Sequence, residues 1–151
     1  MCLTGGKNML GNKVSIEFKS ISQNEGFARV AIAAFVAQLD PTIEELADIK
    51  TAVSEAVTNS IIHGYDSDEN KMIRVEAEIL NNEVTIVVTD FGKGIKDIEK
   101  AREPLYTSRP DLERSGMGFV VMETFMDGLE VESKEGEGTR ITMKKQFNSV
   151  L

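Results

Sequence analysis

Cysteine and long hydrophobic runs are nearly absent from this sequence. Its one cysteine, Cys2, cannot form an internal disulfide, and a chain without a disulfide framework suits a reducing compartment. No apolar run approaches the ~20 residues that span a bilayer, and the first residues lack the basic-then-apolar pattern of a signal peptide. We therefore expect a cytoplasmic protein without a membrane segment.

Basic residues are also few. The 151-residue chain has 17 Lys and Arg against 25 Asp and Glu, a formal net charge of -8. Phosphate backbones select for clustered basic side chains, so this balance argues against nucleic acid as the main partner. With 41% hydrophobic and 28% charged residues, the composition is that of an ordinary globular protein, and the length fits one domain.

Several familiar nucleotide and catalytic signatures are missing as well. Gly5-Gly6-Lys7 lacks the spacing of a P-loop. Asp90-Phe91-Gly92 matches the D-F-G letters of protein kinases, but no H-R-D precedes it. The only histidine is His63, and an isolated histidine at a helix end predicts a capping or packing residue rather than a catalyst.

Hydrophobic spacing in the first half predicts one strand and two helices. Residues 1–12 show no periodicity and are interpreted as a flexible tail, with Met9 as an alternative start. Residues 14–18 alternate as a half-buried strand does, and helical spacing then covers 23–38 and 43 to about 63.

Each of these helices is bounded by its own signals. Ser22 to Glu25 and Thr42 to Glu45 both have the spacing of a capping box. Asp40-Pro41 ends the first helix, and Gly64 is expected to be the C-cap of the second.

The second half predicts mainly strands. The expected elements are strands around 73–77 and 84–88 joined by Asn81-Asn82, a loop at 90–94, a short helix in 96–103, an irregular polar stretch at 104–116, a buried helix over 118–126, and strands at 129–133 and 139–145. The order of elements favours a two-layer α+β sandwich with one sheet and one helix layer.

Glu55 and Asn59 lie four residues apart, so they share one face of the second predicted helix. Their helical neighbours are mostly apolar, and burying unpaired polar groups is costly. Asn59 offers the hard oxygen that Mg²⁺ prefers, and Glu55 could take a proton from a hydroxyl. For an isolated pair, a solvent-facing polar stripe is the ordinary alternative.

Two glycine-rich segments extend the pattern. In Asp90-x-Gly92-x-Gly94, the carboxylate could accept the amine of adenine while the glycines let backbone approach a ligand. In Arg114-Ser-Gly116-Met-Gly118, a helix N-terminus and a forked guanidinium could meet phosphate. A simple turn and a hinge before a core helix are the respective alternatives.

These weak signals gain weight from their order along the chain. Glu55-x-x-x-Asn59, Asp90-x-Gly-x-Gly94, Gly116-x-Gly118 and Gly138-Thr139 resemble the N, G1, G2 and Gly-Thr boxes of the GHKL, or Bergerat-fold, ATP-binding superfamily. This resemblance implies a mixed, mostly antiparallel sheet covered on one face by helices, with ATP and Mg²⁺ bound between them.

A closer resemblance is carried by four stretches. They are Ser22-Gln-Asn-Glu-Gly-Phe-Ala-Arg-Val30, Ala37-Gln-Leu-Asp-Pro41, the run from Ser54-Glu-Ala-Val-Thr-Asn59 through Ile-Ile-His-Gly-Tyr65, and Leu112-Glu-Arg-Ser-Gly-Met-Gly-Phe119. They resemble the anti-sigma-F family of endospore-forming bacteria, whose members are serine-protein kinases and sigma-factor inhibitors. The ATP-binding kinase domain would then cover residues 13–147.

The resemblance implies a role for each matching residue. Glu55 matches the general base, Asn59 the Mg²⁺ ligand, Asp90 the adenine acceptor and Arg114 the catalytic arginine near the γ-phosphate. The other matches are to nucleotide-binding positions (Gly92, Gly94, Gly116, Gly118 and Thr139) and to partner-binding positions (Arg29 and Glu113).

The family also implies partners. A homodimer with ATP is expected to hold sigma factor F away from RNA polymerase and to phosphorylate a serine of an anti-anti-sigma factor. The alternatives are a general-stress anti-sigma-B-type kinase, an ATP-dependent sigma-binding module without kinase activity, and a fragment of a histidine kinase or other multidomain ATPase.

Overall fold

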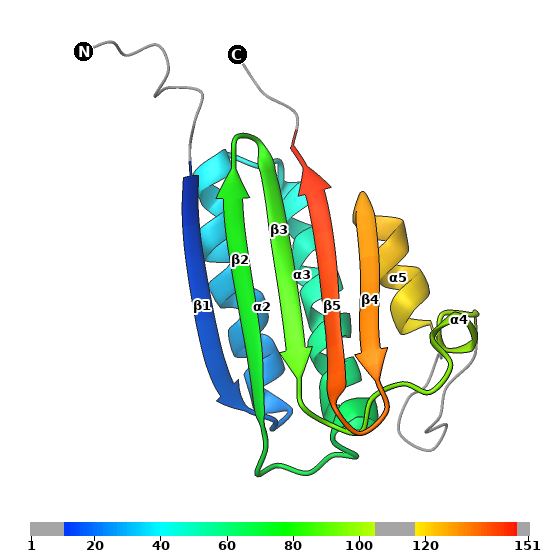
Figure 1. Ribbon diagram of the computed structural model, residues 1–151. Coiled ribbons are helices and arrows are strands. Elements are labelled where there is room, and N and C mark those ends of the chain that lie inside the picture. Colours follow the sequence, from blue (N-terminus) through cyan, green and yellow to red (C-terminus); the bar gives the residue numbers. More distant parts are fainter. Residues whose placement is uncertain (1–10, 105–116, 148–151) are drawn as a thin grey trace.

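The computed structural model describes residues 11–104 and 117–147. Within these residues, five strands form one sheet, and helices cover one of its faces (Figure 1). The predicted two-layer α+β architecture is therefore confirmed. In chain order, the elements are β1 (Gly11–Lys19), α2 (Gln23–Val36), the 3-10 turn η1 (Ala37–Leu39), α3 (Ile43–Asn59), the π-helical turn η2 (Ser60–Gly64), β2 (Met72–Leu80), β3 (Glu83–Asp90), α4 (Ile98–Ala101), α5 (Gly118–Phe125), β4 (Gly128–Lys134) and β5 (Gly138–Gln146).

The strand order in the sheet is β1-β2-β3-β5-β4, and every pair of neighbours is antiparallel. The expectation of a mixed sheet is therefore wrong in this respect. β3 and β4 do run in the same direction, but β5 lies between them. The connection through α4 and α5 leads to β4 at the edge of the sheet, and β5 then pairs between β3 and β4, so no parallel pair forms.

Alternation along the central strands sets the core. In β2, Ile73, Val75 and Ile79 are fully buried beneath the helices, while Arg74 and Glu78 alternate with them. Each buried aliphatic side chain of this size contributes about 1.5–3 kcal/mol relative to an exposed one. β3 follows the same pattern, so the two strands place one apolar face against α2 and α3.

The turn between β2 and β3 is the predicted Asn81-Asn82 hairpin. Leu80 pairs with Glu83, and Asn81 has a φ of 57°. Asparagine tolerates this left-handed conformation better than most residues. The strand β1 pairs with β2 from Gly11 onward, so it begins three residues before the predicted strand at 14–18.

One predicted capping box is confirmed and the other is wrong. At α3, the Thr42 N–H donates to Glu45 Oε1 at 2.9 Å, and the Glu45 N–H donates to Thr42 Oγ1 at 3.0 Å. At α2, Ser22 has helical backbone angles and makes no side-chain cap. Glu25 instead accepts hydrogen bonds from Arg29 at 2.7 Å and from Ser54 on α3 at 2.6 Å.

The end of α3 also differs from the prediction. The α-helix ends at Asn59, and the chain continues as one π-helical turn in which the Tyr65 N–H donates to the Ser60 carbonyl at 2.9 Å. Gly64 is the last residue of that turn, and its φ is not positive. The expected glycine C-cap is therefore wrong, and the need for glycine at residue 64 has another cause.

Candidate nucleotide-binding site

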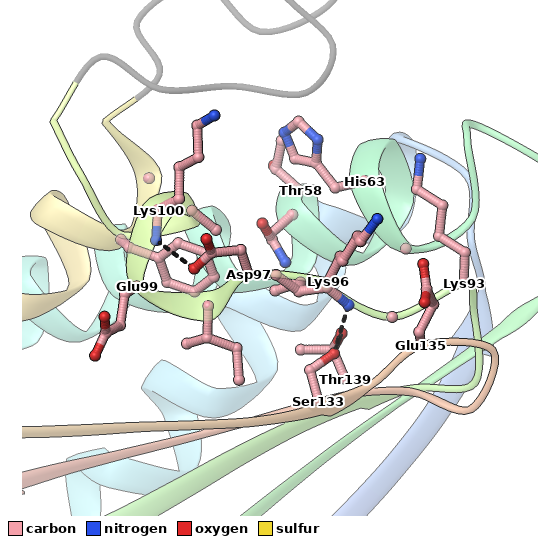
Figure 2. A pocket seen from close by; sticks show the side chains of 18 of the residues that line it. Thr58, His63, Lys93, Lys96, Asp97, Glu99, Lys100, Ser133, Glu135 and Thr139 are labelled. Atoms are coloured by element: carbon pink, nitrogen blue, oxygen red, sulfur yellow. Dashed lines mark hydrogen bonds between the residues drawn. The ribbon is translucent and has the colours of Figure 1, made fainter.

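A cavity of about 850 Å³ lies between the end of α3, the loop after β3, α4, the start of α5 and the β4–β5 turn (Figure 2). This volume is in the range of pockets that bury small organic ligands. Five of the predicted site residues line the cavity: Glu55, Asn59, Gly94, Gly118 and Thr139. The topology therefore brings together positions that are far apart in the sequence.

Asp90, at the end of β3, lies directly behind this cavity. Its Oδ1 accepts a hydrogen bond from the Gly92 N–H at 3.0 Å, and Asp90 is only 1% exposed. Among the described residues, its Oδ2 has no hydrogen-bond partner. Burial raises the pKa of this carboxyl group, while the Gly92 N–H, the Ser60 hydroxyl and the Thr139 N–H lower it. A buried carboxylate with one unsatisfied oxygen is suited to accept a hydrogen bond from a ligand.

Gly64 and Gly92 leave no room for a side chain beside Asp90. A β-carbon on residue 64 would lie 2.7 Å from Asp90 Oδ2, and one on residue 92 would lie 2.0 Å from the Gly64 carbonyl oxygen. The Lys93 N–H donates to that same carbonyl at 3.0 Å. The glycine at 64 therefore lets the helix end approach the carboxylate, which the sequence analysis did not anticipate.

Two further glycines join the loop after β3 to the β4–β5 turn. Gly94 has a φ of +78°, and a β-carbon there would lie 2.2 Å from the Lys134 carbonyl oxygen. Gly138 has a φ of +110°, and its β-carbon would lie 2.2 Å from the Asp90 carbonyl oxygen. Both positions require glycine, because other residues rarely adopt a positive φ and because there is no room for a β-carbon.

Ser133 reinforces this junction. Its Oγ accepts a hydrogen bond from the Ile95 N–H at 2.7 Å and lies 3.0 Å from the Gly138 carbonyl oxygen and 2.8 Å from Thr139 Oγ1. Figure 2 shows Ser133 and Thr139 together on the sheet side of the cavity. Ser133 was not predicted to be a site residue. The signal for it is the alternation of β4, which puts a serine at an inward position after Leu129 and Val131.

Tyr65 is a second residue that the sequence analysis missed. It is 7% exposed, and its hydroxyl donates to the Met72 carbonyl at 2.5 Å and accepts from the Phe91 N–H at 2.8 Å. Burial is the main reason that the pKa of this phenol is raised. Tyr65 therefore fixes the residue that follows Asp90.

The opposite wall is formed by α3, η2 and α4. Glu55 and Asn59 are half-buried and share one face of α3, as predicted from their spacing. His63 lines the same wall, whereas the sequence favoured a packing or capping role for it. Lys93, Lys96 and Lys100 also line the cavity, together with Asp97, Glu99 and Glu135, so the charges of its lining are mixed.

The comparisons with known proteins agree with this geometry. The profile of the histidine kinase-like ATPase domain matches residues 22–145. An anti-sigma F factor of Clostridium botulinum (strain Eklund 17B / Type B) is 70% identical over 140 residues, which cover 93% of this chain and 98% of that protein. The anti-sigma F factor of Clostridium beijerinckii is 68% identical over 142 residues, covering 94% and 99% of the two chains.

The chain belongs to the anti-sigma F factor family. This member of the family carries an ATP-binding domain of the kinase-type ATPase class. A solved structure of the RsbU and RsbW domains of a Mycobacterium tuberculosis protein supports the fold, with a TM-score of 0.61 and 20% identity over 93% of this chain and 34% of that one.

Some predicted residues of this anti-sigma F factor family member lie away from the cavity or outside the described part. Arg29 is on α2, where it donates to Glu25 at 2.7 Å and to Ser54 at 3.3 Å. Glu113, Arg114 and Gly116 lie outside the described residues.

In residues 11–104 and 117–147, no three His, Cys, Asp or Glu side chains are grouped so that they could hold a metal ion. Over the same residues, no helix is both long enough and apolar enough to cross a membrane.

Proposed function

We propose that the cavity binds Mg·ATP and that the protein transfers the γ-phosphate to a serine of an anti-anti-sigma factor, while it also sequesters sigma factor F from RNA polymerase. The observation that carries this proposal is that Glu55 and Asn59 line one cavity of about 850 Å³, and that the buried Asp90 lies directly behind its lining residues Gly64 and Thr139. The kinase-type ATPase domain and the names of the relatives support the same function.

The base of the nucleotide is expected at the Asp90 end of the cavity. Asp90 Oδ2 is the acceptor suited to the exocyclic amine of adenine, because its other oxygen already accepts from Gly92. Gly92 and Gly94 hold the loop close to the ligand by packing on the backbone of neighbouring segments. Thr139, which lines the cavity and is joined to Ser133, completes this end.

The phosphates are expected toward α4 and the start of α5. Asn59 supplies an oxygen ligand to Mg²⁺, which usually takes only one or two protein ligands together with phosphates and waters. Gly118 begins α5, whose first N–H groups are suited to an anion. Gly116 and Arg114, which precede it, are proposed to close over the γ-phosphate, and Lys96 adds positive charge to the wall.

Glu55 is proposed as the general base. It lines the cavity one turn before Asn59, on the same face of α3. From there its carboxylate would take the proton of the attacking serine hydroxyl of the substrate. Phosphoryl transfer depends mainly on positioning and charge neutralisation, so this small set of groups is sufficient for the reaction.

Partner exchange is proposed to follow the nucleotide. With ATP, a homodimer in the cytoplasm would hold sigma factor F; with ADP, it would favour the unphosphorylated anti-anti-sigma factor. Arg29 on α2, held by Glu25 and Ser54, and Glu113 are the proposed partner contacts. The segment 104–116 would couple nucleotide state to binding through Arg114 and the γ-phosphate. The predicted kinase domain, residues 13–147, is proposed to include also the first two residues of β1, Gly11 and Asn12.

A labelled-phosphate assay tests this function. The full chain is incubated with ATP labelled in the γ-phosphate and an anti-anti-sigma protein, beside the same protein with alanine at its acceptor serine. Label on the first protein alone supports the kinase. If the chain binds ATP and retains the sigma factor but transfers no label, the result would support the sigma-binding module without kinase activity. If the chain forms no complex with a sigma factor, the result would favour the multidomain-ATPase alternative. Competition between sigma factors F and B distinguishes the sporulation family from its stress-response relative.

A further inference from the structure

The cavity wall formed by α4 has little packing of its own. Residues 96–101 line the cavity, and Figure 2 shows Asp97, Glu99 and Lys100 beside it. None of the four described residues of α4 is buried. Asp97 Oδ1 accepts from the Lys100 N–H at 3.1 Å, and the Ala101 N–H donates to the Asp97 carbonyl at 3.0 Å. These hydrogen bonds are local, and a helix this short is not stable by itself, so contacts with other elements must hold the wall in place.

The start of this wall is anchored to the sheet. The Ile95 N–H donates to Ser133 Oγ on β4 at 2.7 Å. Ile95 and Ala101 also pack against the hydrophobic core with half-buried side chains. Because Ala101 contributes only a methyl group, this packing is limited at the far end of the helix.

Arg102 connects the far end of α4 to α5 (Figure 1). Its backbone N–H donates to the Ile98 carbonyl at 3.1 Å, so the residue closes the last turn of α4. Its Nε and Nη2 both donate to Glu123 Oε1 on α5, at 3.1 and 2.6 Å. The planar guanidinium group holds its donors in a fixed geometry, so the two bonds orient the end of α4 as well as hold it.

The helix α5 is itself firmly held. Met122 is fully buried, and Phe119 is 6% exposed. At the C-terminal end of the helix, Lys145 Nζ donates to the Phe125 carbonyl at 2.9 Å, and the same ammonium group lies 3.5 Å from Asp48 Oδ2 on α3. The ion pair between α4 and α5 therefore ties a loosely packed wall to a helix that the core fixes.

From these contacts we infer that Arg102 and Glu123 are positioning residues for phosphate binding: their ion pair holds α4 at the distance from α5 at which the cavity admits the phosphates of the nucleotide. The inference rests on the proposed ATP site, in which the phosphates lie toward α4 and the start of α5. Neither side chain is among the described residues that line the cavity, so both act through α4 and neither is a catalytic residue. Without the pair, α4 occupies its binding-competent position only part of the time, and the apparent affinity falls by that fraction.

Glu123→Arg is the most informative variant. It places two guanidinium groups opposite each other, so α4 is no longer held against α5. The dissociation constant for ATP, measured by calorimetry, should rise about fivefold, the upper range for a partly exposed ion pair. The added positive charge alone would instead attract the phosphates and tighten binding. An affinity equal to that of the wild type, or higher, would therefore overturn the inference.

Reversal of both charges tests the pair itself. Arg102→Glu should also weaken ATP binding, whereas the double variant Arg102→Glu/Glu123→Arg restores opposite charges in exchanged positions. Because the two residues are in contact, their effects should not add, and the dissociation constant of the double variant should return to within about twofold of the wild type. A double variant that does not recover the affinity lost in Glu123→Arg would contradict a role for the ion pair.

Glu17→Arg is the matched control. Glu17 accepts from Arg74 Nε at 3.0 Å, and the arginine and glutamate side chains of that pair are 39% and 49% exposed, against 31% and 46% for Arg102 and Glu123. The control makes the same change of charge and should shift the urea midpoint about as much as Glu123→Arg does. Its ATP affinity should stay at the wild-type value. An equal loss of affinity in the two variants would show a general effect of charge or stability and overturn the inference.

The wild-type result separates the two proposals. A wild-type chain that does not bind ATP would refute the proposed ATP site together with this inference. If the wild type binds ATP and Glu123→Arg binds it equally well, only the role of the ion pair is refuted.

Discussion

Gly64 lies against the carboxyl group of Asp90 so closely that a β-carbon on residue 64 would be 2.7 Å from Oδ2. The two residues come from different layers, because Gly64 ends the π-helical turn after α3 and Asp90 ends the strand β3. Their contact fixes the position of α3, which carries Glu55 and Asn59, relative to the Asp90 end of the cavity.

Gly64→Ala is expected to impair nucleotide binding. The added methyl group cannot occupy its place without displacing the Asp90 carboxylate, so ATP affinity should fall at least tenfold in calorimetry. Gly128→Ala is the control, since a β-carbon there would meet only the Lys144 Cβ at 3.8 Å, an ordinary contact. Unchanged ATP affinity in Gly64→Ala would show that the Gly64–Asp90 contact does not shape the site.

Asp90→Asn should separate binding from stability. The amide oxygen can still accept from the Gly92 N–H, but its NH₂ group opposes the amine of adenine, so ATP binding should be lost. The nucleotide-free variant should be at least as stable as the wild type at neutral pH, because a neutral group replaces a buried carboxylate. A clear loss of stability on urea titration at pH 7 would contradict this account.

The pH dependence of stability follows from the same carboxyl group. Burial raises the pKa of Asp90 above its ordinary value of 3.8, so in the window between the two values the native state holds a proton that the unfolded chain has released. The contribution of Asp90 to stability therefore falls as the pH rises through this window. Above the raised pKa it is constant. Measured from pH 4 upward, the unfolding free energy of the wild type should fall relative to that of Asp90→Asn and then stay at a constant difference from it.

Ser133→Ala should loosen the junction beneath the cavity. The Ile95 N–H loses its acceptor, and such a loss costs about 1–3 kcal/mol when the group is buried. Denaturant unfolding should show this destabilisation, together with weaker ATP binding. Ser15→Ala replaces an exposed serine of β1 and should change stability by less than about 0.5 kcal/mol. Equal effects of the two variants would contradict the role given to Ser133.

Asn59→Ala tests the proposed metal ligand. ATP affinity is measured with Mg²⁺ and again with a chelator in its place. The wild type should bind ATP more tightly with Mg²⁺, and the variant should lose most of that difference while keeping its affinity in the chelator. A Mg²⁺ effect of wild-type size in Asn59→Ala would refute the assignment.

The sequence predicts the fold well because its periodicities are strong. Ile73, Val75 and Ala77 alternate with polar residues, and Asn81 marks the hairpin that joins β2 to β3. The absence of a parallel pair could not be foreseen, since alternation does not reveal that β5 lies between β3 and β4.

The site was predicted less completely, because several of its residues act through the backbone of distant segments. The sequence pattern predicts that Gly64 is a helix C-cap, and its close contact with Asp90 can be recognised only in the three-dimensional structure. Ser133 and Tyr65 bond to backbone groups 38 and 26 residues away. That Glu55 and Asn59 share one wall of the cavity could be predicted, because their relationship is local, four residues along one helix.

Glu55→Gln tests the central claim most directly. Rates of phosphate transfer to the serine of the anti-anti-sigma protein and ATP affinity are measured on the same preparations. Since a general base contributes about 10²–10⁴-fold to a reaction, transfer should fall by at least a hundredfold while the ATP dissociation constant changes less than about threefold. Transfer at the wild-type rate would contradict the account of this cavity as a kinase site with Glu55 as its base.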